Sequence, residues 1–306
     1  MKSIATGATI LALSAGTALG GGIDRARLSY GALFEAGSYA EFGFSNVSPS
    51  VSGDYANPAF GTTTGDMAGS YRNYSFTYKR DFGDKVSFGL FVNTPYGADA
   101  NYSVPGLYNG LSAQWSSQQI AGVLRYEVTP AISVYGGLKY ERSKAEINIP
   151  DSLIRGGLQQ AALGGSAQAS AILGGSPAGS LQYTAEGDWD GRFGFIVGAA
   201  YEKPEIALRV GLTYESGYTH KFDSVETIGS PALGPTFAAL GNGTTEVEMP
   251  QSITLDFQTG VAKDTLVFGS IRWAEWSVWQ VRPPAYGAVF GSDITNFEND
   301  VFTYQL

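Results

Sequence analysis

Residues 189–214, WDGRFGFIVGAAYEKPEIALRVGLTY, decide the fold. Over 189–201, apolar or aromatic side chains alternate with smaller or charged ones, and the alternation resumes over 206–214. The polar residues 202–205, EKPE, separate the two runs. A period of two is that of a β-strand, in which successive side chains point to opposite faces. The stretch therefore predicts two antiparallel strands joined by a tight turn.

The same alternation recurs along most of the chain. The predicted strands lie near 33–47, 71–81, 86–95, 115–128, 131–146, 187–202, 205–218, 250–261 and 265–279, and a tenth begins near Val301. In each of them the second face is small or charged, as a water-filled lumen requires, whereas the first face suits lipid. We therefore expect an all-β, transmembrane antiparallel up-and-down β-barrel rather than a soluble β-sandwich.

The composition suits a chain that meets lipid on one surface and water on another. Charged residues are 15% of the 306 residues and aromatic residues 13%, whereas charged residues form about a quarter of an average soluble protein. The net charge of −9 argues against nucleic acid as a partner, because phosphate binding needs a basic face. Cysteine is absent, which excludes disulfides and thiolate metal sites. No cofactor and no metal are expected.

The N-terminus predicts export. A positive second residue precedes a short apolar run, and small residues follow at the two positions that signal peptidase reads, Ala18 and Gly20. We expect a cleaved signal peptide over 1–20, a short N-terminal arm or plug remnant over 21–32, and the barrel over 33–306. No later stretch is long and apolar enough for a membrane helix. The predicted location is the bacterial outer membrane, where spanning chains form closed barrels.

The connectors and the aromatic residues predict the orientation. Short connectors near 81–85, 129–131, 202–205 and 262–265 alternate with long ones near 48–70, 97–114, 147–186, 219–248 and 280–299. Short periplasmic turns and long outer loops are typical of bacterial barrels. Aromatic residues near strand ends are expected to form an interfacial girdle. They are Tyr30, Phe42, Tyr74, Tyr78, Tyr140, Tyr201, Tyr214, Trp273, Trp276 and Trp279.

Two of the long outer connectors are too apolar to be merely solvated. The connector over 147–186 predicts one or two short amphipathic helices, separated by Gly-Gly pairs. Their apolar side either packs down as a plug or receives a hydrophobic ligand, and both interpretations stay open. The connector over 97–114 is similar in kind. The residues predicted to form a ligand-binding groove are Leu107, Leu111, Leu153, Ile154, Leu158, Leu163, Ile172 and Leu173.

Charged side chains are predicted on the lumen face. They form either a lattice of ion pairs or, in part, a grip on an anionic head group, since an unpaired charge inside is costly. The head-group candidates are Arg125, Lys139, Arg192 and Arg209. The alternation also turns inward Lys79, Arg272, Glu41, Glu127, Glu141, Asp188, Asp190, Glu215 and Asp256.

Catalysis is not expected. His220 is the only histidine, and its place at a predicted strand end beside Lys221 predicts a solvated loop residue. An outer-membrane lipase would need a Ser–His pair, and only Ser216 and Thr219 lie near His220 in the sequence.

Six stretches carry a family resemblance. They are 22–25 (GIDR), 31–35 (GALFE), 47–53 (VSPSVSG), 93–99 (NTPYGAD), 249–252 (MPQS) and 273–279 (WAEWSVW). Together they resemble the FadL family (FadL/TodX-like) of outer-membrane long-chain fatty-acid transporters, across essentially the whole mature chain. The last two stretches, a Pro-led strand and a strand that ends in a Trp-Ser-aromatic cluster, are the strongest match.

The resemblance implies a monomeric barrel of about fourteen strands, of which about ten would be present, so that the chain is C-terminally truncated. It also implies an outer capture groove, a tighter site inside, an N-terminal plug that shifts, and sideways release into the membrane. One departure concerns the plug, which in the family usually spans some tens of residues before the first strand and carries Asn-Pro-Ala. Here that triplet is at 57–59, in the first outer loop.

The functional hypothesis is passive transport of long-chain fatty acids or similar hydrophobic compounds across the outer membrane, with lateral exit. Burial of an acyl chain would drive it, at about 0.8 kcal/mol per methylene. The expected partners are that hydrophobic small molecule, outer-membrane lipid and lipopolysaccharide. The alternative is a general aqueous porin for small hydrophilic solutes.

Overall fold

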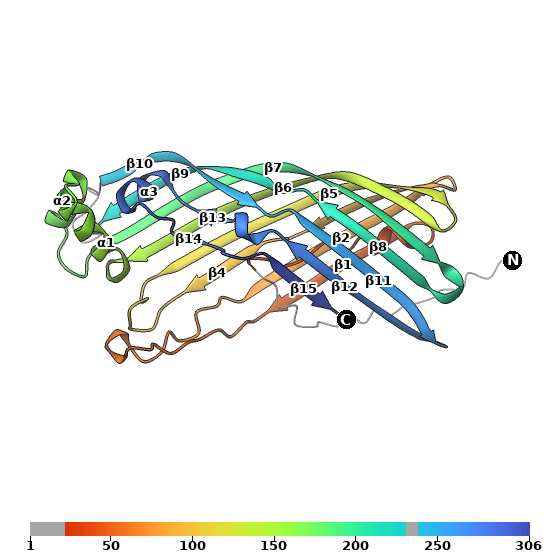
Figure 1. Ribbon diagram of the computed structural model, residues 1–306, viewed down its shortest axis with the longest axis horizontal. Coiled ribbons are helices and arrows are strands. Elements are labelled where there is room, and N and C mark those ends of the chain that lie inside the picture. The colour runs from red at the N-terminus through yellow and green to blue at the C-terminus, as the bar shows by residue number, and fades with distance from the viewer. Residues whose placement is uncertain (1–21, 231–237) are drawn as a thin grey trace.

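The computed structural model describes residues 22–230 and 238–306, so the predicted signal peptide over 1–20 lies outside the described residues. In the described part, thirteen strands form one antiparallel sheet (Figure 1). Ten of them follow one another along the wall in the order β1-β2-β3-β5-β6-β7-β8-β11-β12-β15. The up-and-down arrangement of about ten strands is therefore confirmed.

The ten strands of this path agree with the ten predicted ones within a few residues at most ends. Their bounds are Tyr39–Val47 (β1), Tyr71–Phe82 (β2), Val86–Asn93 (β3), Ser112–Thr129 (β5), Ile132–Pro150 (β6), Gln182–Lys203 (β7), Leu208–Glu215 (β8), Ser252–Ala262 (β11), Thr265–Ala274 (β12) and Val301–Gln305 (β15).

Three further strands were predicted as loops. These are β4 (Gly97–Asn101), β9 (Tyr218–Gly229) and β10 (Ala238–Met249). β9 pairs with β7 and β10, and β4 pairs with β5, so they extend the wall outward. In this outer part the pattern inverts: Phe222 and Val247 are buried inside, whereas Lys221 and Glu246 face out. These strands were therefore not predicted, because the prediction relied on apolar side chains on the outward face.

The first predicted strand begins too early. Residues 33–38 do not join β1, because a 3-10 helix, η1 (Tyr30–Phe34), turns the chain into the barrel. Leu33 is fully buried there and belongs to one apolar cluster with Phe91, Val123 and Ile196 from the wall. The N-terminal arm, defined here as residues 22–34, thus lies inside the barrel.

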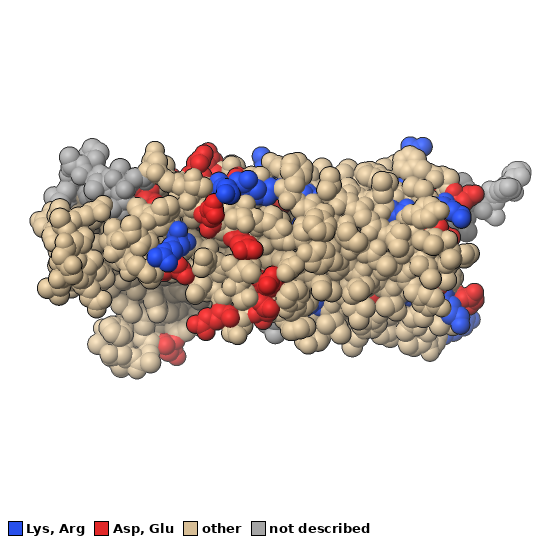
Figure 2. All heavy atoms as spheres, turned by 45° about the horizontal axis from the view of Figure 1, so that its top comes forward, with Lys and Arg blue, Asp and Glu red and all other residues tan. Residues whose placement is uncertain are grey.

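The two predicted faces of the strands are confirmed. Leu138 and Phe193 face outward and are 64% and 70% exposed, whereas Lys139 and Glu141 on the same stretch of wall are buried. Figure 2 shows the consequence, a broad uncharged band with charged side chains on either side of it. The prediction of an interfacial girdle is wrong for three of the aromatic residues, since their side chains are buried in the interior. They are Tyr30, Trp276 and Trp279.

Helices gather at the outer end of the barrel, opposite the tight turns (Figure 1). α1 (Asp151–Leu163) and α2 (Ala167–Gly174) confirm the helices predicted in the long outer loop, while α3 (Pro284–Phe290) was not expected. None of the described helices has the length and apolar character needed to span a membrane. The remaining short elements are η2 (Pro58–Phe60), η3 (Pro204–Ile206), η5 (Trp276–Val278), β13 (Gln280–Val281) and β14 (Thr295–Asn296).

Candidate functional site

An apolar cavity of about 90 Å³ lies inside the outer half of the barrel. Its wall includes Trp115 on β5, Phe222 on β9, Val247 on β10 and Trp279 after η5. All four side chains are at least 94% buried. The inverted pattern of the outer strands creates this cavity, because there the lumen face, rather than the lipid face, carries the apolar side chains.

The aromatic residues of the cavity meet edge to face. The ring of Trp115 lies 5.4 Å from that of Phe222 at 90°, and 6.3 Å from that of Trp279 at 63°. The Nε1 atoms of Trp115 and Trp279 are buried and have no hydrogen-bond partner in the described part of the chain. Buried indole N–H groups usually have a partner. The cavity can therefore hold an apolar guest, and two residues of its wall carry indole N–H groups without a partner among the described residues.

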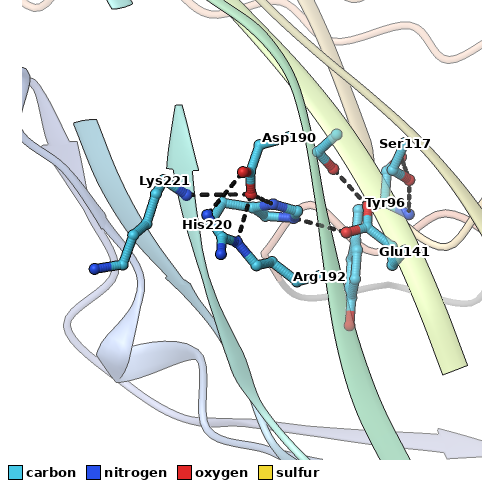
Figure 3. Close-up of polar contacts among 8 residues, drawn as sticks. Tyr96, Ser117, Glu141, Asp190, Arg192, His220 and Lys221 are labelled. Atoms are coloured by element: carbon cyan, nitrogen blue, oxygen red, sulfur yellow. Dashed lines mark hydrogen bonds and ion pairs between the residues drawn. The ribbon is translucent and has the colours of Figure 1, made fainter. Parts of the chain in front are cut away.

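A polar layer adjoins the cavity. His220 is fully buried between two carboxylates, with Nε2 2.6 Å from Glu141 and Nδ1 2.8 Å from Asp190 (Figure 3). Its ring also stacks on Phe222 at 5.1 Å between centroids. The prediction of a solvated loop histidine is therefore wrong, because β9 continues the wall and turns His220 inward. Between 22–230 and 238–306, no group of acidic and histidine side chains is suited to hold a metal.

The predicted outer-loop groove residues are only partly brought together. Ile154, Leu158 and Ile172 are buried in one cluster with wall residues of β6, β7 and β9, and Leu111, Leu153 and Leu173 pack against it. Leu107 lies outside this cluster, and Leu163 is 89% exposed. The helices thus pack down on the inner wall, as a plug would. Ligand binding by these eight residues stays a prediction.

The four predicted head-group cations lie in three separate places, and each has a partner. Arg125 and Arg209 both stack on Phe34 of the N-terminal arm, with the guanidinium carbons 4.6 and 5.0 Å from the ring centroid. Lys139 pairs with Glu215 at 2.9 Å, and Arg192 pairs with Asp190 at 2.7 Å. This arrangement fits the ion-pair lattice, and a head-group role stays a prediction.

One residue predicted in the lumen is placed differently. Asp188 is exposed, because the pairing of β6 with β7 shifts between Ser143 and Ala145. The extra residue in β7 reverses which side chains face outward, so that Asp188 leaves the lumen face.

The wall has a gap beside the cavity. β2 pairs with β3 only from Phe76 onward, and β4 pairs with β5 but not with β2 in the described residues. Residues 71–75 and 94–96 therefore border an unpaired stretch. The N-terminal arm covers it from inside: the Arg25 amide donates to the Pro95 carbonyl at 2.8 Å, and the Arg25 guanidinium lies 3.9 Å from the centroid of the Tyr71 ring.

Sequence reasoning missed the cavity and the His220 layer. Trp115 could have been assigned to the lumen, since it shares the inward face of its strand with Ser117 and Gln119. No comparable signal exists for Trp279 or His220, because their places depend on how η5 and β9 continue the wall.

Comparisons with known proteins agree with this architecture. Residues 32–294 match the model of the family described as outer membrane protein transport protein (OMPP1/FadL/TodX). A Pseudomonas aeruginosa FadL homologue is 14% identical, with a TM-score of 0.59 over 87% of this chain and 65% of that one. No curated protein matches the chain.

Two further solved structures share the fold. The deltaS2S3 mutant of the TodX monoaromatic hydrocarbon channel is 15% identical, with a TM-score of 0.59 over 86% of this chain and 69% of that one. The Ralstonia pickettii toluene transporter TbuX is 12% identical, with a TM-score of 0.52 over 90% and 70%. The chain thus spans 65% of the length of the Pseudomonas aeruginosa structure. It belongs to the OMPP1/FadL/TodX family of outer-membrane transport proteins, whose β-barrel fold it shares.

Proposed function

We propose that this protein, as a monomer, lets hydrophobic molecules cross the outer membrane by passive diffusion, with long-chain fatty acids and monoaromatic hydrocarbons as the cargo classes. The observation that carries the proposal is the apolar cavity walled by Trp115, Phe222, Val247 and Trp279. Burial of each methylene of a guest contributes about 0.8 kcal/mol. Family members with solved structures include a toluene transporter and a monoaromatic hydrocarbon channel, which supports the second cargo class.

The exit is proposed to be sideways. A straight path would lead an apolar guest past the buried charges around His220 and then through the cluster around Leu33. That path is costly in free energy, because an apolar guest offers these charged groups neither water nor a new hydrogen-bond partner. Ile23 and Ala98 line the cavity, and both adjoin the wall gap next to residues 94–96. A shift of the N-terminal arm would open the gap toward lipid.

The aqueous porin alternative is less well supported. A porin needs a continuous water-filled lumen. Here Tyr30, Leu33 and the wall side chains around them form a buried apolar cluster inside the barrel, across such a path. An apolar cavity also offers no favourable site to a sugar or another hydrophilic solute.

The test compares two valines on neighbouring strands that face opposite ways. Val247 is 1% exposed in the cavity, and Val225 is 48% exposed on the outside. Val247→Trp fills the cavity and is expected to weaken binding of a radiolabelled fatty acid and of toluene to the full-length protein by about tenfold. Loss of about two methylene contacts, at about 0.8 kcal/mol each, corresponds roughly to that factor. Val225→Trp is expected to bind as the wild type does.

Folding of both variants is checked by heat-dependent electrophoretic mobility, and Val247→Ala provides a smaller change at the same position. Unchanged binding in a folded Val247→Trp protein would contradict the cavity as the site. Sugar flux into liposomes without saturable binding of either cargo would favour the porin.

A further inference from the structure

The outward side chains of β5, β6 and β7 change from apolar to polar at one level. Ile120, Tyr140 and Phe193 are neighbours across these strands, and the rings of Tyr140 and Phe193 lie 5.0 Å apart. The next outward-facing pair toward α1 is Gln118 with Arg142. This level is therefore the outer edge of the lipid-facing band, and Figure 2 shows charged side chains beginning beyond the uncharged band on the side of the helices.

Two cations share one aromatic ring just above this edge. The Arg142 guanidinium carbon lies 4.9 Å and the Lys144 Nζ 5.8 Å from the centroid of the Trp189 ring. Arg142 also donates from Nε and Nη2 to Gln118 Oε1, at 3.0 and 2.6 Å. Arg142 and Lys144 are exposed, and Trp189 is 40% exposed. The guanidinium is thus held between Gln118 of β5 and Trp189 of β7.

The charges of Arg142 and Lys144 have no ion-pair partner among the described residues. Within the described ranges no carboxylate forms an ion pair with Arg142 or Lys144, whereas the exposed Lys221 two strands away pairs with Glu246 at 2.7 Å. A fixed guanidinium with free N–H donors matches the geometry of a phosphate group. The ammonium group of Lys144 adds a second positive charge beside it.

We propose that Arg142, Lys144 and Trp189 bind a phosphate group of an outer-leaflet lipid, namely lipopolysaccharide. The acyl chains of that lipid would lie on Tyr140 and Phe193 directly below. A lipid is favoured over a soluble anion because the site adjoins the apolar band, so that chain burial and phosphate binding act together. The site is separate from the cargo cavity and does not depend on the proposed cargo.

The test measures lipid retained by the full-length protein in detergent, by native mass spectrometry. The probes are phosphorylated lipid A, the same lipid after phosphatase treatment, and inorganic phosphate. A Lys or Arg at an anionic lipid surface contributes about fivefold to affinity. The variant Arg142→Gln with Lys144→Gln is therefore expected to bind phosphorylated lipid A about 25-fold more weakly.

The matched control is Lys221→Gln, which removes an exposed but paired lysine of the same outer zone and is expected to leave lipid A binding unchanged. Cargo binding should stay at the wild-type level in both variants, which shows that the barrel is folded. Equal binding of dephosphorylated lipid A, or wild-type binding by the double variant, would overturn the proposal. Full competition by millimolar inorganic phosphate would assign the site to soluble anions instead.

Discussion

The carboxylate of Asp24 lies 2.7 Å from the guanidinium of Arg272, although 248 positions separate them in the chain. Both side chains are at most 8% exposed. The pair joins the N-terminal arm to β12, next to the cavity and the wall gap. An ion pair in such surroundings makes the position of the arm depend on both charges being present, because either charge alone would be buried without a partner.

Asp24→Asn should release the N-terminal arm. Leaving Arg272 buried without its partner costs about 3–5 kcal/mol, so hydrogen exchange of residues 22–34 should become much faster. Asp24→Asn combined with Arg272→Gln removes both charges and should restore part of the protection. Slow exchange in the single variant, as in the wild type, would show that the ion pair does not hold the arm.

Gly137→Ala should weaken the pairing of β5 with β6. A methyl group at Gly137 would fall inside contact distance of the Gly122 carbonyl oxygen, which is backbone and cannot swing away. We expect a loss of about 1–3 kcal/mol in the free energy of unfolding in urea. The control is Gly122→Ala, whose methyl group would meet only the Phe88 ring at 3.5 Å. Equal stability of the two variants would contradict this account.

Acid should loosen α1. Burial by itself would raise the pKa of Asp151, but hydrogen bonds from Arg155 and the Leu181 amide outweigh it and lower the pKa below its usual value of 3.8. A carboxyl with a lowered pKa contributes its stability above the unfolded value and loses it as the pH falls through the folded one. The anchor of α1 should therefore be intact at pH 7 and weaken only below about pH 4.

Hydrogen exchange of Asp151–Leu163, corrected for the intrinsic rate, measures this effect. Asp151→Asn should show at pH 7 the faster exchange that the wild type shows only in acid. Glu186→Gln, an exposed carboxylate on β7, serves as the control. A pH response that persists unchanged in Asp151→Asn would assign it to another group.

Glu226→Gln should loosen α3 over the outer mouth. The buried Glu226 carboxylate accepts hydrogen bonds from the amides of Ala285 and Tyr286, at 2.8 and 2.7 Å, and from the Tyr183 hydroxyl at 2.9 Å. Hydrogen bonds to a charged acceptor contribute about 2 kcal/mol each. We expect faster exchange of Pro284–Phe290 and faster cargo entry in stopped-flow binding. Glu248→Gln, on the exposed face of β10, should change neither rate.

Local patterns in the sequence were enough for the wall and for part of its outer cover. The alternation over 189–214 predicts β7 and β8 and their faces, because pleating puts every second side chain on the same side. The apolar spacing of Ile154 and Leu158 likewise predicts α1, since residues four apart share a helix face. Both signals are complete within a few neighbouring residues.

The candidate site could not be predicted in the same way. Trp115, Val247 and Trp279 are far apart in the chain and meet only through strand register and the turn at η5. His220 was misassigned because β9 was expected to be a loop, and Asp188 because one extra residue in β7 reverses the side chains beyond it.

The sequence by itself thus determined that this protein is a barrel with an apolar outside, a charged inside and helices at its outer end. Only the tertiary structure decided that the outer half is apolar within, that His220 lies between Glu141 and Asp190, and that the N-terminal arm covers a gap in the wall. The physical reason is that lipid requires apolar side chains on the outward face of every strand that crosses it, and this requirement produces the same alternation in each strand. Outside the lipid-facing band, the environment of each side chain depends on the residues around it, and strand register across the sheet determines which residues those are.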